Sequence, residues 1–155
     1  MSMTDHTAVV TDTITDFVSR LGLTEDVTVS TQYDETQDLY QVLLQTQNPA
    51  LLIGYHGENL SSLQLIVGQH LHSKLNEWIN LSLNVNDYRE RRESSLHALA
   101  DSAVSRVLAT NQPHSLPPLP AGERRLIHMY LADHPQVSTS SQGVGRARSI
   151  VVSPK

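Results

Sequence analysis

The chain has 155 residues, of which 39% are hydrophobic and 17% are charged, a composition typical of one ordinary globular domain or two small ones. It contains no apolar run near the roughly 20 residues that a membrane-spanning helix needs, and residues 1–6 lack the pattern of a secretory signal. We therefore expect no membrane insertion. The absence of cysteine excludes disulfides, thiolate zinc sites and cysteine nucleophiles, and leads us to expect a cytoplasmic protein.

The first half of the sequence predicts the order helix, strand, strand, short helix, helix, strand. The helices are predicted where apolar side chains recur at helical spacing, and the strands where apolar and polar side chains alternate. Helices are expected over residues 10–21, 50–53 and 60–75, and strands over residues 27–33, 39–46 and 79–85. The polar run 34–38 connects the first two strands as a hairpin.

The second half predicts a long helix first. It starts at Asp87, because Asp87 and Glu90 match the capping-box pattern. Its apolar stripe is formed by Leu96, Leu99, Ala100, Ala103, Val104, Val107 and Leu108. The proline-rich segment 113–120 cannot be helical and is expected to be extended at the edge of a sheet. Beyond it we expect a helix over 121–132, a strand over 137–141, a turn at Gly143 and Gly145, and a last strand over 149–153.

The charge is unevenly distributed between the two halves. Residues 1–86 carry 10 acidic and 2 basic side chains, a net charge of −8, whereas residues 87–155 carry 6 acidic and 9 basic ones, a net charge of +3. Nine of the eleven basic residues are arginine, which is suited to bidentate phosphate contacts. The asymmetry indicates two modules with different electrostatic roles.

Gly54, Tyr55, His56 and Gly57 join the two helices in the middle of the first half. Two glycines three residues apart allow a tight turn and a close approach of a polynucleotide backbone. The helix that follows would direct free N–H groups and its positive dipole end at a phosphate, as in the G-x-x-G loop of a KH domain. Any tight joint between two helices can use two glycines as well, so the pattern gains its meaning from the surrounding element order.

Arg124 and His128 are four residues apart on a predicted helix, so that both side chains project from one face. A guanidinium and an imidazole at this spacing can grip one phosphate and its base together. Arg125 is adjacent, and Arg146 and Arg148 follow in the last predicted hairpin. The alternative is an exposed helix face whose charges only keep the protein soluble.

The start of the long helix contains two further candidates. Arg89 and Arg92 are possible phosphate contacts. The alternative is a solvated helix end in which Arg89, Arg91 and Arg92 pair with Glu90 and Glu93.

Three segments, in this order, resemble the bacterial Jag (KhpB) family. Residues 52–60 resemble its G-x-x-G region, residues 87–93 its interdomain signature, and residues 117–128 its Arg-x-x-x-His motif. The resemblance covers nearly the whole chain and implies an α+β fold of two small modules. These are a KH domain of the prokaryotic type (α-β-β-α-α-β) over 1–86 and an R-three-H domain, with helices on a small sheet, over 87–155.

The resemblance implies an RNA-binding protein, a post-transcriptional regulator or RNA chaperone linked to cell envelope growth and division. The expected partners are single-stranded RNA or single-stranded DNA and a small KH-only protein, with no cofactor or metal. The chain has no G-x-S-x-G nucleophile, P-loop or H-E-x-x-H pattern, so we expect no enzyme. A protein-interaction adaptor that uses the acidic KH half stays open as an alternative.

The sequence departs from the family pattern in two respects. Family members commonly have basic residues in the middle of the G-x-x-G loop, where this chain has Tyr55 and His56. We therefore expect a weakened phosphate clamp there. Many members also have an additional N-terminal domain, which we do not expect in this chain.

Overall fold

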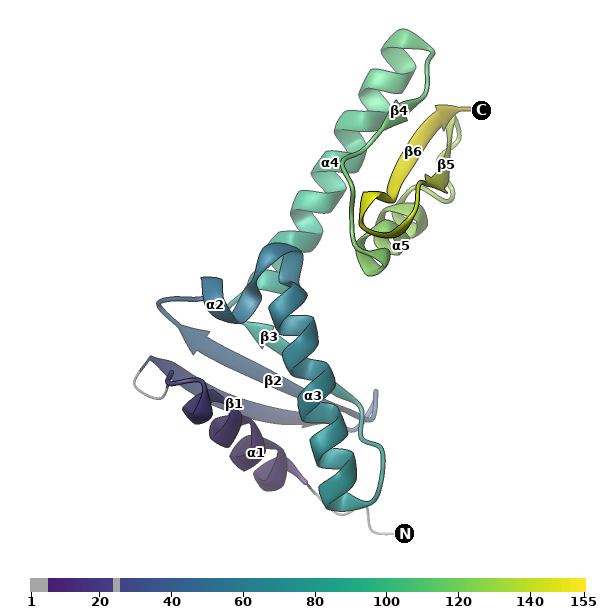
Figure 1. Ribbon diagram of the computed structural model, residues 1–155. Helices are drawn as coiled ribbons and strands as arrows, with labels where there is room; N and C mark the ends of the chain where they lie inside the picture. Colours follow the sequence, from purple (N-terminus) through teal and green to yellow (C-terminus); the bar gives the residue numbers. More distant parts are fainter. Residues whose placement is uncertain (1–5, 24–25) are drawn as a thin grey trace. The chain divides into compact units, whose positions relative to one another are not determined.

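The computed structural model describes residues 6–23 and 26–155 (Figure 1). The chain divides into two compact units, Met1–Arg89 and Glu90–Lys155. The division falls in the first turn of the helix that follows the last strand of the first unit.

The first unit has the element order α-β-β-α-α-β, which confirms the predicted order. Its elements are α1 (Thr7–Arg20), β1 (Val27–Asp34), β2 (Leu39–Thr46), α2 (Ala50–Ile53), the 3-10 turn η1 (Tyr55–Gly57), α3 (Glu58–Leu75) and β3 (Leu81–Val85).

The sheet of the first unit has the strand order β1-β2-β3. The polar turn at 34–38 pairs β1 with β2 antiparallel, as predicted, whereas β3 returns parallel to β2 with Leu81 opposite Tyr40. The prediction that this strand begins at residue 79 was wrong. The register places Asn80 opposite Leu39, the first residue of β2. Residues before Asn80 therefore lie opposite the hairpin turn, where no strand is available for pairing.

Helices α1 and α3 lie across one face of this sheet and bury its core (Figure 1). The core is aliphatic, as the low aromatic content requires, and Tyr40, 4% exposed, is the one aromatic residue among its buried members in the described part of the chain. Its buried members are Val10, Ile14, Val18, Tyr40, Val42, Leu44, Leu52, Leu60, Val67, Leu71, Leu83 and Val85.

The second unit places two helices against a small antiparallel sheet. Its elements are α4 (Tyr88–Thr110), β4 (His114–Ser115), α5 (Ala121–Tyr130), β5 (Val137–Gln142), the 3-10 turn η2 (Gly145–Ala147) and β6 (Ser149–Pro154). The strand order is β4-β6-β5, with the last strand of the chain in the centre. Its core is formed by Leu96, Ala100, Ala103, Val104, Val107, Leu116, Leu119, Ile127, Leu131, Val137, Ile150 and Val152.

Two predictions for the second unit need correction. Leu108 was expected in the apolar stripe of the long helix but is 45% exposed, because it lies about 100° around the helix from the buried Val107. Helix α5 ends at Tyr130 and not at residue 132, and Leu131 follows as its C-cap with its side chain in the core.

The proline-rich segment is extended at the edge of the sheet, as predicted. Only His114 and Ser115 form a regular strand, and beyond them Leu116 N donates to Ile150 O at 2.9 Å and Leu119 N to Arg148 O at 3.2 Å. The segment thus runs beside β6 and delivers the chain to the start of α5. Among the described helices, none combines the length and apolar character needed to cross a membrane.

Candidate nucleic-acid interface

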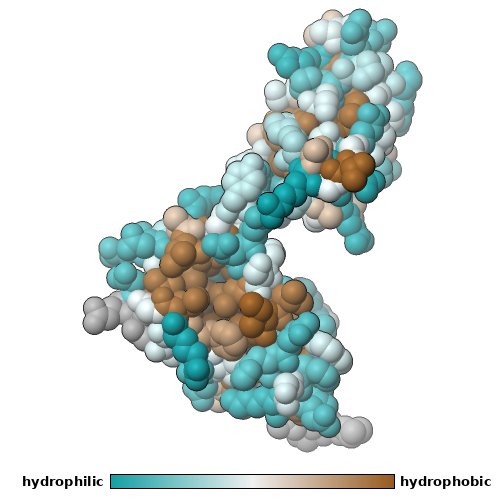
Figure 2. Space-filling model, viewed as in Figure 1, coloured by the Kyte–Doolittle hydropathy of each residue, from teal (hydrophilic) through white to brown (hydrophobic). Residues whose placement is uncertain are grey.

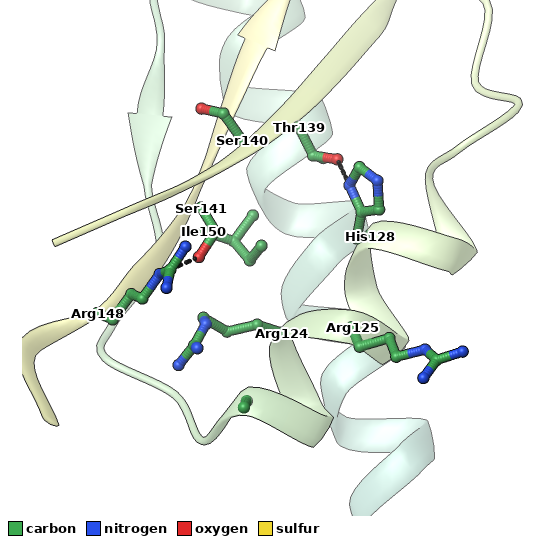
Figure 3. A pocket seen from close by; sticks show the side chains of 9 residues that line it. Arg124, Arg125, His128, Thr139, Ser140, Ser141, Arg148 and Ile150 are labelled. Atoms are coloured by element: carbon green, nitrogen blue, oxygen red, sulfur yellow. Dashed lines mark hydrogen bonds between the residues drawn. The ribbon is translucent and has the colours of Figure 1, made fainter. Parts of the chain in front are cut away.

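A cleft of about 340 Å³ lies in the second unit, between helix α5 and the strands β5 and β6 (Figure 3). It is lined by Ala121, Arg124, Arg125, His128, Thr139, Ser140, Ser141, Arg148 and Ile150. None of these lining residues is acidic. The cleft therefore combines three guanidinium groups, an imidazole and the hydroxyl groups of Thr139 and Ser141, a set of donors suited to a phosphate ester.

Arg124 lies in the first turn of α5 and is half-buried. Its Nη1 donates to the carbonyl oxygen of Leu119 at 2.5 Å, so the proline-rich segment fixes one end of the guanidinium. A guanidinium has five N–H donors. The remaining donors of Arg124 are therefore held in a defined orientation while one is used internally.

His128 follows one turn later and has an exposed ring. Its Nδ1 lies 2.5 Å from the hydroxyl oxygen of Thr139 on β5 (Figure 3). This contact fixes the plane of the imidazole and leaves Nε2 for a ligand. The two residues of the Arg-x-x-x-His motif thus line one cleft, each positioned by a different partner.

Arg148 reaches the same cleft from the position between η2 and β6. Its Nε donates to the Ser141 hydroxyl at 2.9 Å. Ser141 pairs with the buried Ile150, and Thr139 with the buried Val152. Paired residues of antiparallel strands project to the same face, so both hydroxyl groups project from the face of the sheet that carries the core.

The other two predicted arginines of this unit have different settings. Arg125 lines the cleft but is exposed, and Figure 3 shows it pointing away from Arg124 and Arg148, which lie toward the same side. Arg146 is exposed within η2 and is not one of the lining residues.

Arg89 and Arg92 both have protein partners. In the first unit, Arg89 Nε donates to Leu83 O at 2.7 Å and Nη2 to Gln64 Oε1 at 2.9 Å, which links α3, β3 and the start of α4. In the second unit, Arg92 forms a bidentate ion pair with Glu123, at 2.6 and 2.8 Å. Their phosphate contacts stay a prediction, but much of each guanidinium already serves to hold helices in place.

The G-x-x-G loop adopts left-handed backbone at several positions. Gly54 has φ 69°, His56 φ 51° and Gly57 φ 78°, a region that favours glycine. Tyr55 is 75% exposed, and its ring meets that of His56 edge-on at 4.1 Å. The loop thus presents two rings, where a basic loop would present two cations.

Both glycines are also required by close packing. A Cβ on Gly57 would lie 2.9 Å from the Tyr88 hydroxyl, and one on Gly54 would lie 2.5 Å from Cγ of Asn59. Asn59 in turn donates to Leu51 O at 2.8 Å and closes the end of α2. Glu58 occupies the first turn of α3, so a carboxylate competes with any phosphate for the positive end of the helix dipole.

The neutral lining residues of the cleft were not predicted from the sequence. Thr139, Ser140 and Ser141 lie in β5, a strand that was predicted over 137–141 but to which no part in the site was assigned. The signal available in the sequence was the spacing of Thr139 and Ser141, which are two residues apart and therefore lie on the same face of a strand. It gains meaning only once the register with β6 is known, because that register decides which face the hydroxyl groups share.

Comparisons with known proteins agree with this architecture. The family model of the KH domain of KhpA and KhpB matches residues 11–84, and that of the R-three-H domain matches residues 94–154. The chain is 37% identical to the RNA-binding protein KhpB of Lactiplantibacillus plantarum, over 87% of this chain and 41% of that protein. It is 34% identical to RNA-binding protein KhpB of Clostridium symbiosum, over 83% of this chain and 58% of that protein. It is 32% identical to RNA-binding protein KhpB of Bacillus subtilis, over 84% of this chain and 62% of that protein. The chain thus spans about half the length of these curated relatives.

Proposed function

Since the chain belongs to the KhpB family, with a KH domain followed by an R-three-H domain, we propose that it binds single-stranded RNA without catalysing a reaction. In this proposal residues 1–86 act as the KH domain and residues 87–155 as the R-three-H domain. Single-stranded DNA is the alternative ligand of the same chemistry.

The observation that carries the proposal is the cleft between α5, β5 and β6. Arg124 and Arg148 are each held by one hydrogen bond, to Leu119 O and to the Ser141 hydroxyl, and keep further donors for a phosphate. His128 offers a flat ring on the same helix face, on which an unstacked base can lie. Duplex RNA hides its base faces, so a single strand fits this combination better.

A salt titration of RNA binding tests the proposal. We would measure the anisotropy of a fluorescent 20-nucleotide single strand with the full chain, at several NaCl concentrations, beside a duplex of the same sequence. Each phosphate contact contributes about 0.7 to the slope of log affinity against log salt for single strands, so three arginines predict a slope of about −2. Equal affinity for strand and duplex, or no dependence on salt, would contradict it.

The G-x-x-G loop is proposed as a second, weaker contact. Replacing Tyr55 and His56 by two lysines should tighten binding and steepen the salt slope, because two cations then flank the start of α3. Replacing both by aspartates should weaken binding. Melting curves of both variants provide the control for folding. Equal affinities of the two variants would mean that the loop does not contact RNA.

The proposal assigns this activity to post-transcriptional regulation or RNA chaperoning, connected with cell envelope growth and division, in the cytoplasm. Its basis is the family relationship, and its test is crosslinking of the protein to RNA in cells with sequencing of the footprints. Enrichment of transcripts for envelope and division proteins is the expected result. A footprint restricted to other transcripts would contradict the assignment.

A small KH-only protein is proposed as a protein partner, because one family model describes the KH domains of both KhpA and KhpB. The surface available for it contains Leu51, Leu65 and Ile66, which are 60%, 63% and 53% exposed. Figure 2 shows an apolar area over α2 and α3. Ile66→Asp should abolish co-elution with a KH-only protein while leaving RNA binding by the cleft unchanged, and unchanged co-elution would remove this surface from the proposal.

A further inference from the structure

The single tryptophan of the chain lies on the surface of the first unit, in the segment between α3 and β3. Trp78 is 71% exposed. Its ring stacks on that of His72, with centroids 3.9 Å apart and planes inclined by 6°. The stack orients the indole and uses one of its faces. We propose that Trp78 and the carboxylates near it form a docking site for an arginine- or lysine-rich segment of a partner protein.

The acidic groups come from two segments that the fold brings together. Asn80 Nδ2 donates to the carbonyl oxygen of Asp38 at 3.0 Å, and Tyr40 N donates to Asn80 O at 2.9 Å. These bonds tie the segment that carries Trp78 to the β1–β2 hairpin turn. The turn contains Asp34, Glu35 and Asp38, and Glu77 directly precedes the tryptophan.

Local hydrogen bonds hold several of these carboxylates in place. Asp34 Oδ1 accepts from the backbone N–H of Thr36 at 2.9 Å and of Gln37 at 3.2 Å. Asp38 accepts from the Tyr33 hydroxyl at 2.7 Å, and this hydrogen bond is the main cause that raises the pKa of Tyr33 to about 12. The turn therefore presents negative charge with a fixed geometry.

The two other carboxylates are accessible. Glu35 is exposed at the tip of the turn. Glu77 Oε1 is hydrogen-bonded to the His6 ring at Nε2, and its side chain is 53% exposed. Lys74, in the last turn of α3, is the only lysine or arginine in residues 21–86, against seven acidic residues, so this part of the sequence is predominantly acidic.

A cationic side chain is the ligand that suits an indole and carboxylates together. Tryptophan is the strongest aromatic partner for Arg and Lys, and it is enriched among residues that dominate binding energy at interfaces. A nucleic acid could also stack on the ring, but the net charge of −8 of residues 1–86 repels phosphates. The observations thus favour a basic peptide over RNA.

This site is separate from the cleft of the second unit and does not depend on the proposed RNA binding. It gives the acidic half of the chain a function as a protein adaptor. Basic segments are common in proteins that themselves bind nucleic acid, so this site would allow the chain to engage such a protein directly.

Trp78 is its own reporter, because no other tryptophan contributes to the fluorescence of the chain. We would titrate the full chain with a ten-residue peptide of alternating Arg and Ser, a Gln-Ser peptide of equal length, and a ten-nucleotide RNA. The expected result is a saturable change in emission with the Arg-Ser peptide alone, weakened by added salt. A change with RNA and none with the peptide would overturn the proposal in favour of base stacking, and no change with any probe would also overturn it.

Variants locate the binding with a labelled Arg-Ser peptide. Trp78→Ala should weaken its affinity on the order of tenfold, and the pair Glu35→Gln with Glu77→Gln several-fold. The matched controls are Leu21→Ala, another exposed apolar residue, and Asp26→Asn, at the far end of β1 from the hairpin turn. The site would be refuted if both test variants bound the peptide as tightly as the unmodified chain. It would also be refuted if the control variants lost as much affinity as the test variants. If Trp78→Ala lowers the melting temperature, the double variant Glu35→Gln with Glu77→Gln still tests the site, because both side chains are exposed.

Discussion

Replacing Arg124 by alanine tests the cleft most directly. The guanidinium donates through Nη1 to Leu119 O and keeps donors for a phosphate. A hydrogen bond that involves a charged group contributes about 1.5–3 kcal/mol, so the Kd for single-stranded RNA should rise roughly 10- to 150-fold. Arg124→Lys keeps the charge but loses the bidentate geometry, and its Kd should lie between that of the unmodified chain and that of Arg124→Ala.

The same substitution has a smaller effect on folding. Losing the hydrogen bond to Leu119 O should cost about 1 kcal/mol, below the range for charged groups because Arg124 is only half-buried and water can replace it, and this corresponds to roughly 4–8 °C in the melting temperature of a unit of this size. Binding is therefore measured well below that temperature, where the variant is still folded. Arg106→Ala is the matched control, because it removes the same charge from an exposed position on α4 outside the cleft.

A double-mutant cycle with His128→Ala decides whether the two residues act as one site. Both line the cleft from one helix face, so their losses should be non-additive by at least about 0.5 kcal/mol. The affinities would come from anisotropy titrations at one fixed salt concentration. Strictly additive losses, or a loss in Arg106→Ala as large as in Arg124→Ala, would refute the reasoning from the cleft.

Three further predictions concern packing and charge. Gly57→Ala should lower the melting temperature, because it combines a left-handed φ of 78° with a clash, whereas Gly68→Ala, a helical position with free space, should raise it slightly. Arg92→Ala should destabilise the second unit by more than the double variant with Glu123→Ala in urea unfolding, because Arg92→Ala removes the bidentate cation from a carboxylate that is only 13% exposed, whereas the double variant removes that carboxylate as well. A stability of the double variant no greater than that of Arg92→Ala would contradict this. The raised pKa of Tyr33, about 12, means that its hydrogen bond stabilises the fold below pH 10 and that this contribution is lost as the pH rises through 12. The difference in absorbance at 295 nm between the chain and Tyr33→Phe should then titrate near pH 12 and not near pH 10.

The element order and the core were predictable because both depend on local periodicity. The apolar stripes of α1, α3 and α4 repeat at helical spacing, and most of their members are buried as expected. The end of a strand, in contrast, depends on its partner. The start of β3 at Leu81 follows from the start of β2, which the pattern around residue 79 does not contain.

The candidate site was predictable in its charges and not in its geometry. The spacing of Arg124 and His128 gave their common face, and the composition gave the surplus of arginine. The bonds to Leu119 O, Thr139 and Ser141 depend on a register between segments far apart in the chain. No local pattern encodes such contacts, because they arise from the packing of the sheet against α5.

The folded positions of the arginines change what the charge of the second half means. A count along the sequence treats all 9 basic groups in residues 87–155 alike. In the structure, Arg92 is paired with Glu123 and Arg89 donates to Leu83 and Gln64, whereas three arginines line the cleft. A diffuse surface that used all nine would give a salt slope of about −6, and the cleft alone gives about −2. The measured slope therefore distinguishes a protein that attracts RNA over a whole surface from one that grips it at a single cleft, and the partners of Arg89 and Arg92 favour the single cleft.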